Sequence, residues 1–148
     1  MLESFTEIKK VAIFGSVRKH GFEKALRDLF AVLNEKSVEI FLDAEVNGFV
    51  VANSLHDLPE FSLLKKEEYS SLDLALSLGG DGTFLRTAYK VGEAGVPILG
   101  INLGNLGFLV DVPGDEIKTA INEIFSAGFT VEERSLLSLK RSDEEGNS

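Results

Sequence analysis

Residues 72–83 read Leu-Asp-Leu-Ala-Leu-Ser-Leu-Gly-Gly-Asp-Gly-Thr, an apolar run followed at once by three glycines around one carboxylate. The run predicts a buried strand over Leu72–Leu78, and the pattern after it predicts a helix from Thr83 to about Ala94. Glycine lets a ligand approach the main chain, and a helix N-terminus offers unpaired N–H groups to an anion. A carboxylate beside phosphate would repel it, so Asp81 needs a separate task. It could bridge through a divalent metal or accept a proton from an attacking hydroxyl, and both tasks indicate phosphoryl transfer.

Strands and helices alternate on both sides of this unit. The periodicity predicts strands over Val11–Phe14, Val38–Leu42 and Val96–Ile101, and helices over Phe22–Lys36 and Asp115–Ala127. Shorter extended pieces are expected at 108–110 and from 129 to 139. Residues 44–71 are treated as peripheral, because Val46–Leu55 could form a short helix while Asn47-Gly48 favours a turn. The alternation predicts an α/β fold with an open, mostly parallel sheet.

Size and composition allow one domain with a proper core: 148 residues, 44% hydrophobic and 26% charged. The net charge of −9 argues against general attraction to nucleic acid or to an anionic membrane. Cysteine is absent, which excludes disulfides and thiolate chemistry. Without a secretory signal or an apolar stretch of roughly 20 residues, we expect a cytoplasmic protein. Residues 140–148 carry no hydrophobic side chain and look like a hairpin turn or a frayed end.

A second loop rich in glycine and asparagine, Asn102 to Gly107, follows the strand that ends at Ile101. Parallel strands present their carboxyl ends to one crevice, so both glycine loops should meet there. Asn102 could contact a ligand or simply tolerate left-handed backbone geometry, with the two options about even. For Asn105 the backbone explanation is the better one.

Other side chains near the two loops each allow two interpretations. Asp81 could merely cap the helix, and Thr83 could cap it or touch phosphate. Arg86 opposes the helix dipole, which indicates an anionic ligand unless the side chain is simply solvated. Phe108 could stack on a base or pack in the core. The basic run 18–20 could reach the same crevice, although a solvated loop is the more common outcome for such a run.

Two familiar nucleotide motifs are absent. No Gly-x-Gly-x-x-Gly fingerprint follows the first predicted strand, and the chain has no phosphate-binding loop ending in Gly-Lys-Ser or Gly-Lys-Thr. The two histidines, His20 and His56, lack metal-ligand spacing. The sequence therefore indicates neither an ordinary dehydrogenase nor a P-loop enzyme.

Taken together, the two loops resemble the motifs of the NAD kinase family. The stretch 79–83, Gly-Gly-Asp-Gly-Thr, resembles the family signature, and 100–109, Gly-Ile-Asn-Leu-Gly-Asn-Leu-Gly-Phe-Leu, resembles its second motif almost letter for letter. The stretch 128–134 is a weaker match. The resemblance covers about residues 10–140, and the second motif makes it specific, because diacylglycerol and sphingosine-type lipid kinases share the first.

The resemblance implies a Rossmann-like three-layer fold of the phosphofructokinase and NAD kinase type. It also implies transfer of a phosphoryl group from ATP or polyphosphate, with Mg²⁺ or another divalent metal, to the adenosine-ribose 2′-hydroxyl of NAD. Asp81 would accept the proton of that hydroxyl, Gly82 would lie against the ligand, Arg86 would contact it and Phe108 would line the adenine side. No residue is assigned as a metal ligand. With the reasoning from the residues, the expected nucleotide-binding set is Gly79, Gly80, Gly82, Thr83, Arg86, Asn102, Gly104 and Phe108.

The domain prediction is a nucleotide-binding α/β domain over 1–139 and a polar tail over 140–148. Family members are longer and continue into a β-rich domain that supplies an Asn-Glu or Asn-Asp motif, which is missing after Arg134 here. We therefore expect this chain to be the N-terminal half, weak or inactive by itself, and a homo-oligomer when full length. Two alternatives remain, a lipid kinase domain and a non-catalytic nucleotide-binding module. The lipid kinase is disfavoured by the residues Phe84–Ala88 after the signature and by the lack of a membrane-binding face.

Overall fold

The computed structural model describes residues 2–4, 7–104, 107, 109–110, 112–127 and 129–131, with the backbone alone for 2–4 and 129–131. A six-stranded sheet, parallel throughout, runs through its centre in the order β4-β3-β2-β5-β6-β7. Its strands are β2 Lys10–Gly15, β3 Glu39–Leu42, β4 Ser62–Leu63, β5 Leu74–Gly79, β6 Ile98–Asn102 and β7 Val112–Pro113. A separate antiparallel pair joins β1, Leu2–Ser4, to β8, Phe129–Val131.

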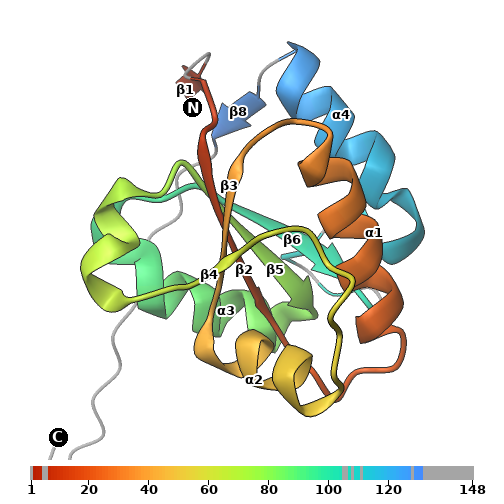
Figure 1. Ribbon diagram of the computed structural model, residues 1–148. Helices are drawn as coiled ribbons and strands as arrows, with labels where there is room; N and C mark the ends of the chain where they lie inside the picture. The colour runs from red at the N-terminus through yellow and green to blue at the C-terminus, as the bar shows by residue number, and fades with distance from the viewer. Residues whose placement is uncertain are drawn as a thin grey trace, which may run out of the picture.

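Helices cover both faces of the sheet, which gives the expected three layers (Figure 1). The α-helices are α1 Phe22–Asn34, α2 Ala44–Ala52, α3 Asp81–Val91 and α4 Ile117–Ala127. Short 3-10 turns cover Lys66–Ser71, Gly92–Ala94 and Gly114–Glu116. Helices α1 and α4 pack side by side on one face, and α3 packs against β5 on the other.

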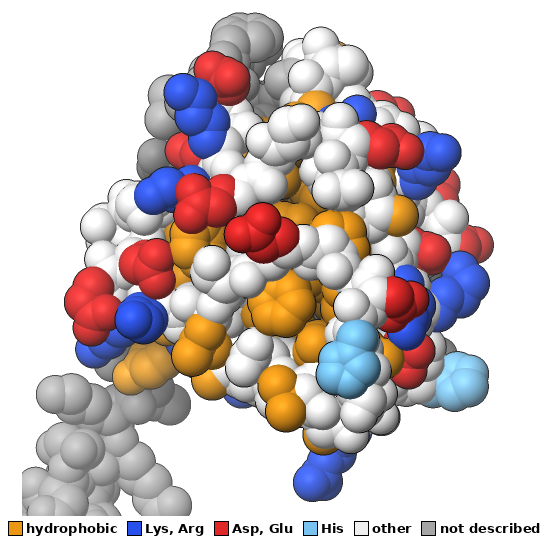
Figure 2. Space-filling view, in the orientation of Figure 1, with side chains coloured by type: hydrophobic (Ala, Val, Ile, Leu, Met, Phe, Trp, Pro, Cys, Tyr) orange, Lys and Arg blue, Asp and Glu red, His pale blue; other side chains and the backbone are white. Residues whose placement is uncertain are grey.

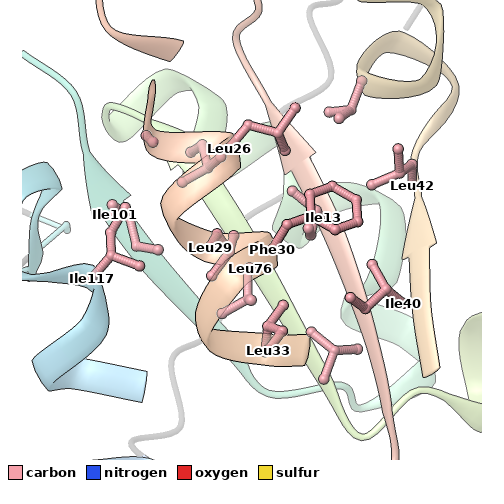
Figure 3. Close-up of a cluster of buried hydrophobic side chains, with 14 of the residues drawn as sticks. Ile13, Leu26, Leu29, Phe30, Leu33, Ile40, Leu42, Leu76, Ile101 and Ile117 are labelled. Atoms are coloured by element: carbon pink, nitrogen blue, oxygen red, sulfur yellow. The ribbon is translucent and has the colours of Figure 1, made fainter. Parts of the chain in front are cut away.

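The larger core lies between α1 and the sheet, as Figure 3 shows. Leu26, Leu29 and Phe30 of α1 recur at helical spacing and are fully buried. They meet Ile13 of β2 and Leu76 of β5. This packing fixes the height of α1 over the sheet, and with it the position of the loop that enters the helix.

The sequence predicted the main strands and helices within a few residues, with three informative differences. Helix α3 begins at Asp81 rather than Thr83, because Gly80 is extended and an acidic residue in the first turn suits the helix dipole. Asn47-Gly48 lies inside α2, where Val46 and Val50 are buried one turn apart and outweigh the turn signal. The helical stretch expected to reach Ala94 ends in a 3-10 turn, and Gly95 adopts the left-handed conformation (φ 71°) expected of its cap.

Three short strands were not predicted, namely β1, β7 and β4, which lies in the stretch treated as peripheral. Of the extended piece expected at 108–110, residue 108 lies outside the described residues and 109–110 form no strand. Strand β7 follows, two residues long, and Pro113 is tolerated there at the sheet edge. Strand β1 has only three residues and pairs with a segment far along the chain, so local pattern did not reveal it. The polar tail over 140–148 lies outside the described residues.

The surface seen in Figure 2 mixes acidic and basic side chains rather than separating them by sign. Within the described part of the chain, no helix combines the length and the apolar character that crossing a membrane requires.

Candidate phosphoryl-transfer site

The strand order changes direction between β2 and β5, the position where open α/β sheets bind ligands. From β2 the chain moves outward to β3 and β4, and then returns to β5 on the other side of β2. The loop after β2 leads to α1 on one face, whereas the loop after β5 leads to α3 on the other. The loop after β6 leaves the same edge, so three loops start at neighbouring positions along it.

The loop after β5 is tight because Gly79 packs directly on Thr83. A Cβ at Gly79 would collide with Thr83 Oγ1, so the first turn of α3 can lie this close to the strand only without a side chain there. Gly80 is extended, and its carbonyl accepts the first helical hydrogen bond from Phe84 N at 3.0 Å. No side chain caps this end of the helix. The amides of the first turn, with the helix dipole, thus provide a place for an anion.

Asp81 connects the two glycine loops. Its Oδ1 accepts a hydrogen bond from Leu109 N at 3.1 Å, and its carboxyl group lies directly against Gly107. A Cβ at Gly107 would collide with all three carboxyl atoms. The acid therefore points toward the second loop, and a backbone amide fixes its direction.

The end of β6 is fastened to the end of β5. Leu103 N donates to Gly79 O at 2.8 Å, and the pair Gly79 and Asn102 lies in register. Asn102 is buried, and its Oδ1 accepts from Gly104 N at 2.9 Å. This turn gives Asn102 a structural role, and any ligand contact would add to it. Lys19 Nζ, from the loop after β2, lies 3.7 Å from the position a Cβ on Gly104 would take.

A polar cluster joins the loop after β2 to α3. Thr83 is buried, and its Oγ1 lies 2.8 Å from Ser16 Oγ. Arg86 Nη2 donates to Ser16 Oγ at 3.0 Å and to Thr83 Oγ1 at 3.3 Å. The Thr83 hydroxyl therefore serves this cluster rather than capping its own helix. These two bonds hold the Arg86 side chain toward the loop after β2 and the start of α3. A freely solvated arginine would have no fixed position.

Most of the predicted site residues come together at this edge. Among the described residues, a Cβ on Gly80 would meet nothing within 4 Å and one on Gly82 would meet only Arg86 Nη1 at 3.7 Å, so there is space beside the main chain there. Phe108, predicted to line the adenine side, and Asn105 lie outside the described residues. Sequence reasoning missed Ser16 and the contact of Gly107 with Asp81. The signal for Gly107 was its place in the second motif, whereas nothing local distinguished Ser16.

No group of three or more His, Asp or Glu side chains lies close enough to hold a metal ion within the described ranges. The residues seen here therefore do not form a metal site of their own. A divalent ion bound mainly through nucleotide phosphates and water needs no such group.

Comparison with protein families finds that the sequence model of the ATP-NAD kinase N-terminal domain matches residues 11–129 of this chain. The chain belongs to the NAD kinase family. An NAD kinase of Bacteroides fragilis is 38% identical over 130 residues, which are 88% of this chain and 44% of the relative. One from Flavobacterium psychrophilum is 34% identical over 132 residues, which are 88% of this chain and 45% of the relative. The chain thus spans less than half the length of these relatives.

A solved structure of yeast NADH kinase, complexed with NADH, superposes with a TM-score of 0.68 at 20% identity. The match covers 84% of this chain and 40% of the yeast chain. At that identity the likeness establishes a shared fold, and it confirms the predicted α/β architecture of the NAD kinase N-terminal domain.

Proposed function

We propose that this chain is the nucleotide-binding half of an NAD kinase. The whole enzyme would transfer the terminal phosphoryl group of ATP, or of polyphosphate, to the 2′-hydroxyl of the adenosine ribose of NAD, giving NADP. The observation that carries the proposal is the position of Asp81, between the start of α3 and the second glycine loop, in a chain of this family.

Asp81 is proposed as the proton acceptor. As the new bond forms between the ribose oxygen and phosphorus, the bond from phosphorus to the nucleoside diphosphate breaks and the hydroxyl proton passes to the carboxylate. An ordinary carboxylate is a weak base for a ribose hydroxyl, so it accepts the proton late in the step. The Leu109 N–H bond to Oδ1 would hold the carboxylate in one direction during this step. Positioning of this kind supplies much of the catalysis in phosphoryl transfer.

The accessible backbone of Gly80 and Gly82 and the Arg86 guanidinium are proposed to bind phosphate oxygens. Thr83 and Asn102 would shape the two loops, with Gly79 allowing α3 to lie close to β5 and the Gly104 amide closing the turn at Asn102. Phe108 remains the proposed adenine contact. Mg²⁺ would enter with the phosphates of the donor and neutralise their charge.

The alternative activity, phosphorylation of a lipid, has less support. The family match extends over the second glycine loop and on to residue 129, which the shared signature alone would not require. The other alternative, binding without turnover, applies to the isolated chain. Because it spans less than half of its relatives, we propose that it needs a following β-rich domain to complete the dinucleotide site. A cytoplasmic location and a homo-oligomeric whole enzyme belong to the same proposal.

The test is to compare the 148-residue chain with the full reading frame that contains it. Each is incubated with NAD, ATP and magnesium, and NADP is measured by a coupled NADP-specific dehydrogenase. We expect NADP from the full frame and little or none from the chain. Phosphorylation of diacylglycerol or sphingosine in place of NAD would refute the assignment, and robust turnover by the chain alone would refute the need for a second domain.

A further inference from the structure

The cluster at the base of α3 holds a residue that neither the motifs nor the family match assigns. Ser16 directly follows β2, and its amide donates to Leu78 O of β5 at 2.9 Å. Its hydroxyl is therefore fixed at the junction of the two central strands. From there it contacts both Thr83 Oγ1 and Arg86 Nη2.

Hydrogen bonds link all three side chains of this cluster to one another. Arg86 Nη2 donates to both hydroxyl oxygens, so both act as acceptors toward it. The Ser16–Thr83 contact uses one of the two hydroxyl protons, so the two oxygens are also hydrogen-bonded to each other.

The geometry also fixes the arginine. Arg86 is exposed, and a long exposed side chain loses much rotamer freedom when it is held in one place. The two hydroxyls hold the Nη2 end of the guanidinium, while Nη1 lies near Gly82 on the first turn of α3. The guanidinium is thereby preorganised beside the amides that an anion would use.

We propose that Ser16 is a positioning residue that holds Arg86 against the first turn of α3 for binding a phosphate group of the nucleotide. The proposal rests on the proposed function, since it names a further residue of that site. Ser16 acts through Arg86, so its contribution should disappear when the guanidinium is removed.

The experiment is a double-mutant cycle of Ser16→Ala and Arg86→Ala in the full reading frame, with ATP and NAD varied separately. Ser16→Ala should lower kcat/KM for ATP on the order of tenfold, the scale of one hydrogen bond to a charged group. In the Arg86→Ala background the same change should cost less than about twofold. Ser16→Thr keeps the hydroxyl and should restore most of the activity. Ser71→Ala is the matched control, because Ser71 is exposed and its Oγ donates to the Glu68 carbonyl on the surface, with no other partner among the described residues.

Melting temperatures separate this role from a structural one. The expected result is an unchanged melting temperature for Ser16→Ala with the loss confined to ATP kinetics. The proposal is overturned if Ser16→Ala retains wild-type kinetics, if its effect is the same with and without Arg86, or if Ser16→Thr is folded yet as impaired as Ser16→Ala. Should Ser16→Ala fail to fold, Ser16→Thr and Arg86→Lys test the proposal instead. Arg86→Lys removes the Nη2 that donates to both hydroxyls, so it should lower kcat/KM for ATP as Ser16→Ala was expected to do. Failure of the proposed function would differ from all of these, because the wild-type frame would then make no NADP.

Discussion

Replacing Gly107 with alanine should disable the enzyme while leaving the fold intact. The new Cβ would overlap Cγ, Oδ1 and Oδ2 of Asp81. Because ordinary carbon contacts lie near 3.5–4.0 Å, the carboxylate has to move by about 1 Å. It cannot do so and keep the 3.1 Å bond to Leu109 N.

The effect on turnover should exceed the effect on stability. A misplacement of about 1 Å in a reacting group costs on the order of 100-fold in rate. A hydrogen bond to a charged group such as that from Leu109 N contributes about 1.5–3 kcal/mol to the free energy of unfolding. Because the half-buried Asp81 can bond to water instead, we expect the lower end of this range. We therefore expect a roughly 100-fold fall in kcat for NADP formation in the full reading frame, with a modest drop in melting temperature.

Gly104→Ala is the matched control in the same loop. A Cβ there would meet nothing closer than Lys19 Nζ at 3.7 Å, an ordinary contact. It should keep kcat within about threefold, because no atom has to move. The reasoning is refuted if Gly107→Ala turns over like the wild type, or if Gly104→Ala is equally impaired at equal stability.

Three further outcomes test the surrounding structure. Gly80→Ala adds a methyl group in open space at an extended residue, so the free energy of unfolding should stay within about 0.5 kcal/mol of wild type. ATP affinity, measured by calorimetry, should fall because the methyl group occupies the proposed phosphate position. Unchanged affinity would place the phosphate elsewhere. Lys90→Met leaves the buried Asp43 carboxylate without its 3.1 Å partner and should cost about 1–3 kcal/mol in urea denaturation, whereas no change would mean that the pair adds nothing. The Arg27 hydrogen bond lowers the pKa of Asp57 below 3.8. The small contribution of this pair to stability is therefore present above that pH and fades as the pH falls through the lowered pKa. Carboxyl NMR should show that Arg27→Gln raises the pKa of Asp57, and an unaltered titration would contradict the pairing.

The strand, turn and helix around Asp81 were predictable because their signals are local. An apolar run ending in glycines predicts a buried strand and a tight turn, and both occur. The meeting of the two glycine loops was predictable from topology, since neighbouring parallel strands end at one edge. These two inferences were enough to bring Asp81 and the second loop to one edge, while the direction of its side chain came from the structure.

Contacts that depend on side-chain packing between distant segments were not predictable. Ser16 and Arg86 are separated by 70 residues, and they meet only because β2 and β5 are in register and α3 lies at a particular height. Nothing in the sequence around Ser16 marks it as different from other loop serines. Likewise, the two residues of β7 are too few to produce a periodic pattern.

The most direct measurement is NADP formation by the full reading frame with Asp81 replaced by asparagine. The side chain keeps its size and can still accept from Leu109 N, but it can no longer take a proton. We predict that kcat falls at least about 100-fold, the scale of a general base, while the melting temperature and the KM for NAD stay close to wild type. An Asp81→Asn enzyme with near-normal kcat would contradict the assignment of Asp81 as the proton acceptor.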